Sequence, residues 1–565
     1  GSSIATSVKS LQKALTLVKN TPRPLDGNLI VHLSGTFTNE QLNFDSDEYI
    51  GTSETKRVIF RGDEDGSTRL LGGHPLEFVK VESLDANHPA RKLAQDTGTD
   101  LSNLWAASPP PNFPTNNKLM QWSDGDCRDT EDYSSPPTLA LNGEVVLTRA
   151  REPNLPPRTA GTGQESMGEV RDSWLRSKSS DSKGRLKFKD DDLNSIFKAS
   201  NPSWNSGSVV MHIFPLVDWY DARVAVGNRF RNNQLFKSKT TLKAPGNPDG
   251  GTKFRIAKEA RYYLEGAVEY LDEEGEYFVS LGETEANSRG WTLLYPPSGF
   301  DMESTETSFV LSLSKDPLIT AETGENMYLS FEKLHIEGSR RNLVQLYGHS
   351  TDFTDCTFIN SGHDAIDAYG QGLTFSGCIF EGTGGSALRL GDDRDFDSDG
   401  ANFLLLESGN ALVDSLISDF ASTCRHYSEG IGLGGYGTIV SNNHFRSSNM
   451  AAIDVVGGGF KILHNIFSHV SDGSYDDGAI HWVAESPMER GTEVAYNLFF
   501  RNGVSSEPCN AETSCYQADI YMDDSAGAMT IHGNVMIKDK VIQVKPPSDA
   551  YAKIQWLGIL VNGGA

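Results

Sequence analysis

The chain has 565 residues, with 55 glycines, 24 prolines and 37% hydrophobic residues, a length beyond one ordinary compact core and a composition that favours turns and strands. Its 76 acidic residues outnumber its 50 basic residues and give a net charge of −26, which excludes nucleic acid and anionic membranes as natural partners. The sequence contains no run of about 18 consecutive apolar residues, so a membrane-spanning helix is not expected.

The N-terminal segment is predicted to cap a repeating structure. Its apolar residues recur at helical spacing and would lie on one face of a helix; they are Val8, Leu11, Leu15 and Val18. The first residues lack the basic-then-apolar order of a signal peptide, so we expect a mature or recombinant end. The acidic surface would suit a secreted or extracellular protein, in which salt screens the charge. Strand-like segments between residues 28 and 80 are expected to form the first coils. We therefore assign residues 1–84 to the cap and these coils.

The periodicity fails between residues 85 and 300. Proline-rich segments such as "SPPPNFP" and "PNLPPR" alternate there with strand-like segments such as "ARVAVGNRF" and "GEYFVSLG". Proline interrupts regular ladders, whereas the alternating segments are typical of short strands. We therefore predict an inserted β-rich domain over residues 85–300 and a main solenoid over residues 301–565.

A repeat of 22 residues is visible in the second half of the chain. The segments "FTDCTFINSGHDAIDAYG" and "FSGCIFEGTGGSALRLG" align at this shift, so that Phe353 matches Phe375 and Cys356 matches Cys378. A period of this length built from short strands predicts an all-β fold, a right-handed parallel β-helix. One turn of each coil repeats an asparagine, and these side chains are expected to form a hydrogen-bonded ladder. They are Asn443, Asn465, Asn497 and Asn534.

Aligning the coils predicts one outward-facing column of side chains. Each coil has two apolar residues separated by one other residue, as in Ile366, Asp367 and Ala368. Because side chains alternate along a strand, the separating residue points outward. The separating residues are Asp367, Arg389, Gly432, Asp454, His481 and Tyr521. Such a column indicates an active face, with a solvated ladder of cross-coil ion pairs as the alternative.

Acidic turns lie beside the same column. Asp476 and Asp477 precede the strand of His481, and Asp523 and Asp524 end the strand one coil later. Two carboxylates about one coil apart can flank a glycosidic bond, one as the acid and the other as the base or nucleophile. Each aspartate alone is also typical of a turn cap. Two more polar residues lie at the edge of the gap that Gly432 leaves in the column, namely His426 and Glu429.

One further loop is a candidate metal site. The segment "GDDRDFDSDGAN" places Asp395, Asp397 and Asp399 at alternate positions before a glycine. This spacing can wrap Ca²⁺, with the glycine allowing a sharp turn. A solvated acidic loop without metal is the alternative interpretation.

Several segments resemble right-handed β-helix carbohydrate-active enzymes. They are, in order, "GGSALRLGDDR", "HYSEGIGLGGYGTIVSNNHF", "MAAIDVVGGGFKILHNIF", "DDGAIHW" and "DIYMDDSAGAMTIHGN". The chain resembles glycoside hydrolase family 141 and, more distantly, family 120. This resemblance implies hydrolysis of plant or algal polysaccharide, with Asp477 and Asp523 at the positions of the catalytic carboxylates and Asp524 as the competitor for the second. His481 departs from the pattern, which usually has an aromatic residue there.

Three functions stay open at this point. The first is a secreted polysaccharide-degrading glycoside hydrolase that uses Asp477 and Asp523 and requires no cofactor. In it His481 and Tyr521 assist catalysis, and the residues that bind the sugar are Asp367, Arg389, Asp454, Asp476, Asp524, His426 and Glu429. The second is a polysaccharide lyase or uronate epimerase, in which His481 or Tyr521 removes a proton while Arg389 or calcium neutralises the uronate carboxylate. The third is a carbohydrate-binding solenoid without catalysis.

Overall fold

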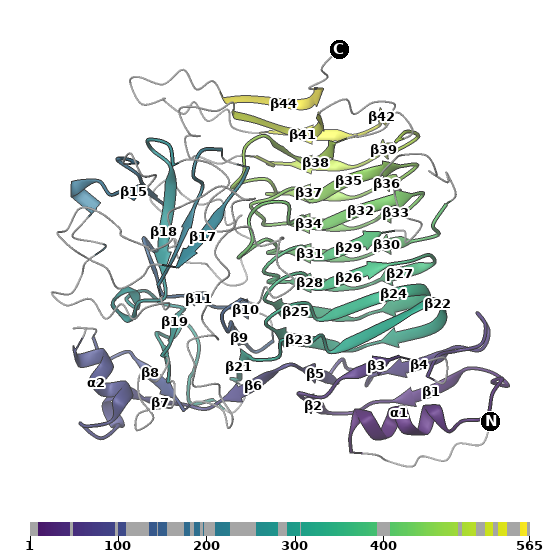
Figure 1. Cartoon of the computed structure of the whole chain (residues 1–565), viewed down its shortest axis with the longest axis horizontal. Helices are drawn as coiled ribbons and strands as arrows, with labels where there is room; N and C mark the ends of the chain where they lie inside the picture. Colours follow the sequence, from purple (N-terminus) through teal and green to yellow (C-terminus); the bar gives the residue numbers. More distant parts are fainter. Residues whose placement is uncertain are drawn as a thin grey trace.

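The computed structural model shows a long stack of coils with a second, irregular region packed against one side (Figure 1). The structure describes residues 9–45, 49–96, 100–108, 135–143, 145–154, 174–180, 186–192, 196, 209–217, 219–225, 256–280, 291–304, 307–391, 407–483, 489–503, 515–523, 529–538 and 554–561. Within these residues the coils form two parallel sheets, and only two α-helices are present. The predicted parallel β-helix is therefore confirmed.

Each full coil contains three short strands, which we call its first, second and third strand. The first strands are β24 (Val344–Thr354), β26 (Ile366–Tyr369), β29 (Leu388–Gly391), β32 (Ile431–Tyr436), β35 (Ile453–Gly458), β38 (Asp477–Val483), β41 (Cys515–Asp523) and β44 (Ile554–Val561). The second strands are β27 (Leu373–Ser376), β30 (Ala411–Val413), β33 (Ile439–Ser441), β36 (Lys461–Leu463), β39 (Glu493–Ala495) and β42 (Thr530–His532), while β24 also continues into this position. The third strands are β23 (His335–Ser339), β25 (Thr357–Ser361), β28 (Ile379–Glu381), β31 (Leu416–Ser418), β34 (His444–Arg446), β37 (Ile466–Ser468), β40 (Leu498–Phe500) and β43 (Val535–Ile537).

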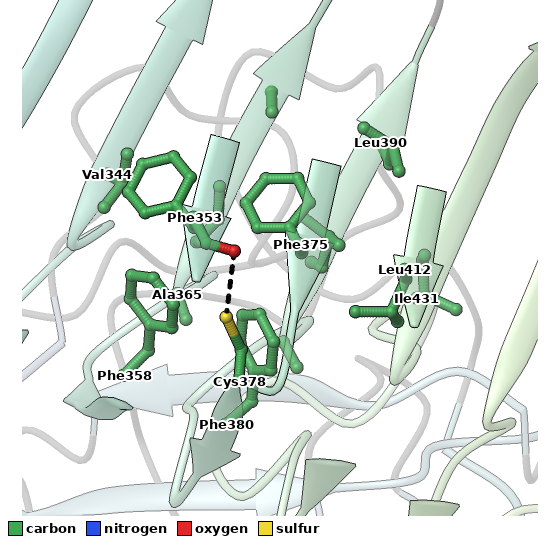
Figure 2. Packing of buried hydrophobic residues seen from close by; sticks show 14 of the residues in the cluster. Val344, Phe353, Phe358, Ala365, Phe375, Cys378, Phe380, Leu390, Leu412 and Ile431 are labelled. Atoms are coloured by element: carbon green, nitrogen blue, oxygen red, sulfur yellow. Dashed lines mark hydrogen bonds between the residues drawn. The ribbon is translucent and has the colours of Figure 1, made fainter. Parts of the chain in front are cut away.

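The repeated phenylalanines form the core of the coils (Figure 2). Phe353 pairs in register with Phe375, which confirms the 22-residue alignment, and their rings stack with centroids 5.3 Å apart. Phe358 and Phe380 stack in the same way at 4.9 Å. Stacked buried rings contribute about 0.5–1.5 kcal/mol per pair beyond the area they bury. The repeat therefore stabilises the stack through contacts between each coil and the next.

The predicted asparagine ladder is present at the turn between the second and third strands. The side-chain oxygen of Asn465 accepts hydrogen bonds from the backbone N–H and the side-chain amide of Asn443, at 2.9 and 3.1 Å. Asn497 and Asn534 continue the same pattern. Each amide also donates to a backbone carbonyl, as Asn465 does to Val440. The ladder satisfies buried turn backbone that would otherwise be costly.

A helix covers the first coil, as the sequence predicts. Helix α1 (Leu11–Lys19) buries Leu11, Leu15 and Val18 against the coils, whereas Val8 lies outside the described residues. The strands that follow are β1 (Leu29–His32), β2 (Thr36–Thr38), β3 (Leu42–Phe44), β4 (Val58–Arg61) and β5 (Arg69–Leu71). The chain rejoins this stack at β22 (Ile319–Glu332), which pairs in parallel with β3, β4 and β24.

The region between β5 and β22 forms antiparallel and mixed sheets instead of coils. Its strands are β6 (Gly73–Leu76), β7 (Phe78–Lys80), β8 (Trp105–Ala107), β9 (Leu139–Leu141), β10 (Val145–Val146), β11 (Thr148–Arg149), β12 (Arg151–Glu152), β13 (Leu175–Arg176), β14 (Ser179–Ser180), β15 (Leu186–Lys187), β16 (Val210–Ile213), β17 (Ala222–Ala225), β18 (Arg261–Glu265), β19 (Glu276–Val279), β20 (Thr292–Leu294) and β21 (Phe309–Ser312), and it also contains helix α2 (Pro89–Asp96). Strands β6 and β7, which we expected among the first coils, pair antiparallel with β21 and β8. The coils resume at Ile319, after the expected residue 301.

Buried polar contacts fix this region against the coils. The guanidinium of Arg261 donates to the backbone carbonyl of Gly473 at 2.7 Å, and Arg340 donates to the carbonyl of Ser135 at 2.8 Å. Gly473 lies in the turn between β37 and β38, and β38 is the strand that carries His481. The inserted region therefore packs against turns that lead directly into the first strands.

Candidate active site

The outward column predicted from the sequence is present on the first strands. Cross-coil pairing joins Asp367 to Arg389, Arg389 to Gly432, Gly432 to Asp454, Asp454 to His481 and His481 to Tyr521. The apolar residues on either side of the column, such as Ile453 and Val455, point into the core. We call the outer surface of these strands the first-strand face.

His481 lies between two carboxylates on this face. Its Nδ1 is 2.9 Å from Oδ1 of Asp454, a hydrogen bond between neighbouring coils. Its Nε2 is 3.9 Å from Oδ2 of Asp523, which lies one coil further along. The side chains of Asp454 and Asp523 are 22% and 17% exposed, so both are accessible to a ligand. A third carboxylate, Asp477, also interacts electrostatically with His481.

The carboxylates keep His481 protonated. Burial alone lowers the pKa of the imidazole, but the contacts with Asp454 and Asp523 raise it, and the resulting pKa lies well above the ordinary value of 6.5. An imidazolium that bridges two carboxylates neutralises part of their mutual repulsion. The raised pKa favours the imidazolium form of His481, which makes a hydrogen bond with Asp454 and lies 3.9 Å from Asp523.

Asp477 lies beneath this group instead of on the surface. The residue is only 4% exposed, its Oδ1 accepts a hydrogen bond from the backbone N–H of Gly478, and its Oδ2 is buried without a partner. Burial raises the pKa of its carboxyl to about 6, against an opposing effect of the His481 charge. The sequence placed Asp477 at the reacting bond, but the fold turns its carboxyl away from solvent.

Tyr521 is also buried, contrary to the outward position expected for it. Its hydroxyl donates to Oδ1 of Asp476 at 2.8 Å, and its ring lies 5.4 Å from that of His481. Tyr521 is buried where β41 packs against β38, and a Cβ built on Gly478 would lie only 2.9 Å from the Cβ of Tyr521. The buried ring and its hydrogen bond to Asp476 therefore support the strand of His481.

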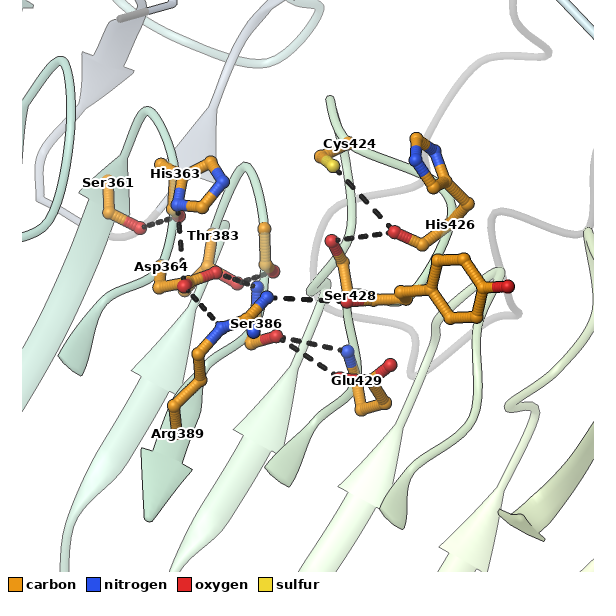
Figure 3. A network of polar contacts seen from close by, with 12 residues as sticks. Ser361, His363, Asp364, Thr383, Ser386, Arg389, Cys424, His426, Ser428 and Glu429 are labelled. Atoms are coloured by element: carbon orange, nitrogen blue, oxygen red, sulfur yellow. Dashed lines mark hydrogen bonds and ion pairs between the residues drawn. The ribbon is translucent and has the colours of Figure 1, made fainter. Parts of the chain in front are cut away.

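A second charged cluster lies further along the same face (Figure 3). Nε of Arg389 lies 2.6 Å from Oδ2 of Asp364, and its Nη2 donates to the carbonyl of Tyr427 at 3.3 Å. Oδ1 of Asp364 accepts from the backbone N–H of Ser386 at 2.7 Å. Glu429 is buried beside them, and its backbone N–H donates to the hydroxyl of Ser386 at 3.1 Å. Arg389 is thus held by a buried partner from the preceding coil.

The charge on Asp364 has an effect on Asp367. Burial raises the pKa of Asp367, and the neighbouring Asp364 carboxylate raises it further, to about 6. Burial would also raise the pKa of Asp364, but the charges of Arg389 and His363 hold this pKa well below the ordinary value. Asp364 therefore carries the negative charge that pairs with Arg389 at 2.6 Å, although Asp367 is the residue beside Arg389 in the column.

The glycine gap between the two clusters has room for a ligand. A Cβ built on Gly432 would lie 3.6 Å from Oε2 of Glu429 and 4.0 Å from Cγ of Arg389, which are ordinary contact distances. The side chains on either side along the column, Arg389 and Asp454, are both partly exposed. The first-strand face therefore carries two acidic clusters with an open position between them.

His426 does not reach this face. Its Nδ1 contacts Oδ1 of Asp221, a residue of the inserted region, and both side chains are buried. The same carboxylate also accepts from the backbone N–H of Arg425. His426 therefore fastens the inserted region to the coils, in place of the substrate-binding role predicted for it.

A cavity of about 100 Å³ lies at this junction. Its described lining includes Arg149, Arg151 and Arg425 together with Glu265. None of the residues predicted for the site is part of this lining. The cavity is therefore separate from the first-strand face.

The remaining predicted residues lie outside the described part of the chain. They are Asp395, Asp397 and Asp399 of the candidate calcium loop, and Asp524. Within the described ranges, no group of three or more histidine, cysteine, aspartate or glutamate side chains is arranged to hold a metal ion. The described helices are too short or too polar to cross a membrane.

Two residues that matter for the arrangement were not expected from the sequence. Asp364 has a weak sequence signal, because the 22-residue shift places it over Ser386, although Glu429 occupies the same position one coil further along. Asp221 has none, since it meets His426 across a separation of 205 residues. Only the folded chain brings these two carboxylates to their partners.

Comparisons with known proteins agree with the fold. A family model described as "Right handed beta helix region" matches residues 319–545, which confirms the predicted handedness. A solved structure named "Glycoside hydrolase" aligns with 98% of this chain and 93% of its own at a TM-score of 0.60 and 13% identity. A search of curated protein sequences finds no significant match.

Two other solved structures are similar to smaller parts of the fold. An alginate lyase from Paenibacillus sp. str. FPU-7 aligns with 44% of this chain and 78% of its own at 13% identity and a TM-score of 0.29. The catalytic unit of a GH87 alpha-1,3-glucanase from Streptomyces thermodiastaticus strain HF3-3 aligns with 76% of this chain and 96% of its own at 9% identity and a TM-score of 0.26. Scores this low do not indicate a shared overall structure.

Proposed function

We propose that this protein is a glycoside hydrolase that cleaves a neutral polysaccharide on the first-strand face, at Asp454 and Asp523. The observation that supports this most directly is the position of these two partly exposed carboxylates on opposite sides of His481, at 2.9 and 3.9 Å from its ring nitrogens. Glycoside hydrolysis uses such a pair, one to protonate the leaving oxygen and the other to activate water or attack the sugar. Neither role requires a cofactor.

The spacing of the pair favours inversion at the anomeric carbon. Asp454 lies on β35 and Asp523 on β41, two coils apart, and adjacent strands are separated by about 4.8 Å. The two strands are therefore about 10 Å apart, and Asp523 lies two residues further along its strand than the residue paired with His481. Both side chains reach toward the imidazole, at 2.9 and 3.9 Å from its nitrogens. Inverting enzymes hold their carboxyl groups about 6.5–9.5 Å apart to leave room for a water molecule, whereas retaining enzymes need about 5–5.5 Å.

Asp477 and His481 act through this pair. The positive charge of the His481 imidazolium fixes the orientation of both carboxylates. A neutral side chain such as glutamine would not supply this charge. Asp477 lies behind the imidazole and contributes to the electrostatic balance of the group. In this proposal Asp454 takes the place that the sequence suggested for Asp477, because Asp454 and Asp523 are partly exposed whereas Asp477 is buried.

The charge of the face points to a neutral sugar chain. Carboxylates outnumber cations on this face and directly beneath it. The partly exposed carboxylates are Asp367, Asp454 and Asp523 and the buried ones are Asp364, Glu429 and Asp477, whereas the cations are Arg389 and His481. The guanidinium of Arg389 is already paired with Asp364, and a protonated His481 cannot abstract a proton. A uronate polymer would be repelled here, which disfavours a lyase or epimerase.

The similarity to known enzymes is in line with this proposal. The solved structure that shares the fold over nearly the whole chain is named a glycoside hydrolase. The motifs that resemble family 141 place an acidic residue at Asp523. We therefore extend the proposal to polysaccharide degradation by an enzyme related to that family.

The test is to measure the products of the wild-type protein and of four variants on a panel of neutral and uronate polysaccharides. We expect new reducing ends from a neutral polymer, without unsaturated uronate, and release of the inverted anomer as followed by NMR. Asp454→Asn and Asp523→Asn should each lower kcat at least about 100-fold. Asp414→Asn is the matched control, because Asp414 is exposed at the turn between the second and third strands.

The Asp477→Asn variant distinguishes the two possible pairs. If Asp477→Asn loses as much activity as Asp523→Asn while Asp454→Asn stays active, the pair is Asp477 and Asp523. Unsaturated uronate in the products would instead establish elimination. Full activity of both Asp454→Asn and Asp523→Asn would overturn the proposed site.

A further inference from the structure

A second column of side chains runs beside the charged one on the first-strand face. It consists of the residues two positions further along each strand, in order Tyr347, Tyr369, Gly391, Gly434, Val456, Val483 and Asp523. At one end the column is aromatic, in the middle it has no side chains, and at the other end it reaches a carboxylate of the proposed catalytic pair. We call these residues the apolar track.

The two tyrosines of this track are exposed to an unusual degree. Tyr347 is 49% exposed and Tyr369 is 39% exposed, and Val456 further along is 39% exposed. Single exposed apolar residues need no explanation, but several in one column on the same face indicate a binding surface. The tyrosines lie on adjacent coils, about 4.8 Å apart, which is close to the length of one pyranose unit.

The glycine next to Tyr369 lets its ring lie along the face. A Cβ built on Gly391 would lie 2.5 and 2.6 Å from Cδ1 and Cε1 of Tyr369, so the ring occupies the space that a side chain at residue 391 would need. Tyr347 lies in a similar way beside Gly324, at 3.6 Å from such a Cβ. Asp367 lies two positions before Tyr369 on the same strand, so the two side chains lie on the same side of β26.

The two columns together match the two-sided chemistry of a sugar ring. One side of a pyranose presents C–H groups that pack on an aromatic ring, and its edge presents hydroxyls that donate to carboxylates. The apolar track supplies the rings, while the charged column beside it supplies Asp367 as an acceptor. This combination favours a neutral glycan over an extended peptide, which would need unpaired strand edges.

We propose that Tyr347 and Tyr369 form a sugar-stacking subsite that binds the substrate chain several units away from the cleaved bond. The inference rests on the proposed hydrolase function. Tyr369 lies on β26 and Asp454 on β35, three coils apart, which corresponds to about 14 Å. The positions of Gly432 and Gly434, which carry no side chain, lie between them. A chain must therefore extend over about three sugar units to reach the tyrosines, and the enzyme acts within long chains.

The test compares binding and turnover across oligosaccharides of increasing length. The probes are gluco-, xylo- and manno-oligosaccharides from dimers to octamers, and binding is measured by calorimetry in the Asp523→Asn background so that no cleavage occurs. Tyr347→Ala and Tyr369→Ala should weaken binding of the longest probes by about 10-fold, which corresponds to about 1.4 kcal/mol. The loss should shrink as the probes become shorter. Tyr369→Trp should keep the affinity for long probes.

Tyr496→Ala is the control, because Tyr496 is 54% exposed on a different turn of the coils and should leave binding unchanged. The same loss at every probe length, or no loss in either tyrosine variant, would overturn the subsite even if hydrolysis is found. If the tyrosine variants lose affinity in a length-dependent way but the protein never cleaves the bound glycan, the subsite is supported and the proposed hydrolase function is wrong. Absence of binding to any probe would overturn both.

Discussion

Nε of Arg389 lies 2.6 Å from Oδ2 of Asp364, and this buried pair joins two successive coils at the edge of the first-strand face. Asp364 is 3% exposed and Arg389 is 25% exposed, so the guanidinium alone reaches solvent. The pair explains why the one arginine of the charged column is not available as a counter-charge for a uronate. It also gives a first prediction about stability.

Replacing Asp364 by Asn should destabilise the protein by about 3–5 kcal/mol, because it leaves Arg389 in a largely buried position without its partner charge. Urea unfolding of the single variants and of Asp364→Asn/Arg389→Gln measures the coupling. The double variant should be more stable than the sum of the two single losses predicts. Additive losses would show that the pair contributes no coupling.

Replacing His481 by Gln should move the acidic limb of the pH–rate profile to higher pH. Without the imidazolium, the carboxylates of Asp454 and Asp523 lose the positive charge between them and repel each other. We expect kcat at neutral pH to fall by about 10- to 100-fold. An unshifted profile with a simple loss of rate would indicate that His481 is only a packing residue.

Replacing Asp477 by Asn should stabilise the protein at neutral pH and leave it unchanged near pH 4. Burial raises the pKa of this carboxyl from 3.8 to about 6, so the folded state binds more protons than the unfolded state between these values. In the wild-type protein the stabilisation that comes from the protonated Asp477 carboxyl is therefore present at low pH and is lost as the pH rises through about 6. The difference amounts to about 3 kcal/mol above pH 6. Melting temperatures of both proteins from pH 4 to pH 8 test this, and parallel curves would contradict it.

Replacing Asn465 by Ala should cost about 1–3 kcal/mol, because it leaves buried backbone groups of the ladder without partners. The amide of Asn465 donates to Val440, and its oxygen accepts from Asn443. Lys461→Ala on the exposed side of the same coil is the control. Equal denaturant midpoints for the two variants would argue against a structural role of the ladder.

Replacing Gly432 by Val should block the face without unfolding the protein. A Cβ fits at this position with ordinary contacts, and valine is favourable in a strand. The Gly432→Ala variant should therefore remain active, whereas the larger valine should raise KM for the polymer. Melting temperatures close to that of the wild type would show that the effect is local. Unchanged KM in Gly432→Val would place the substrate elsewhere.

The sequence carries the repeat because each coil packs on its neighbours. Phe353 and Phe375 align in the sequence at a shift of 22 residues. Because this shift is the length of one coil, the two residues pair in register in the structure. Alternation along each strand then determines which residues face outward, as it does for Asp454 and His481. The fold, the asparagine ladder and the charged column could therefore be predicted from spacing alone.

The tertiary structure decided the exposure and the partners of these residues. Asp477 and Tyr521 are both buried, and the hydroxyl of Tyr521 donates to Asp476 immediately before β38. The meeting of His426 with Asp221 depends on the docking of the inserted region, which has no repeat to predict it. Spacing along a chain determines register within a repeat, whereas burial and charge pairing depend on what long turns and a separate region place over that repeat.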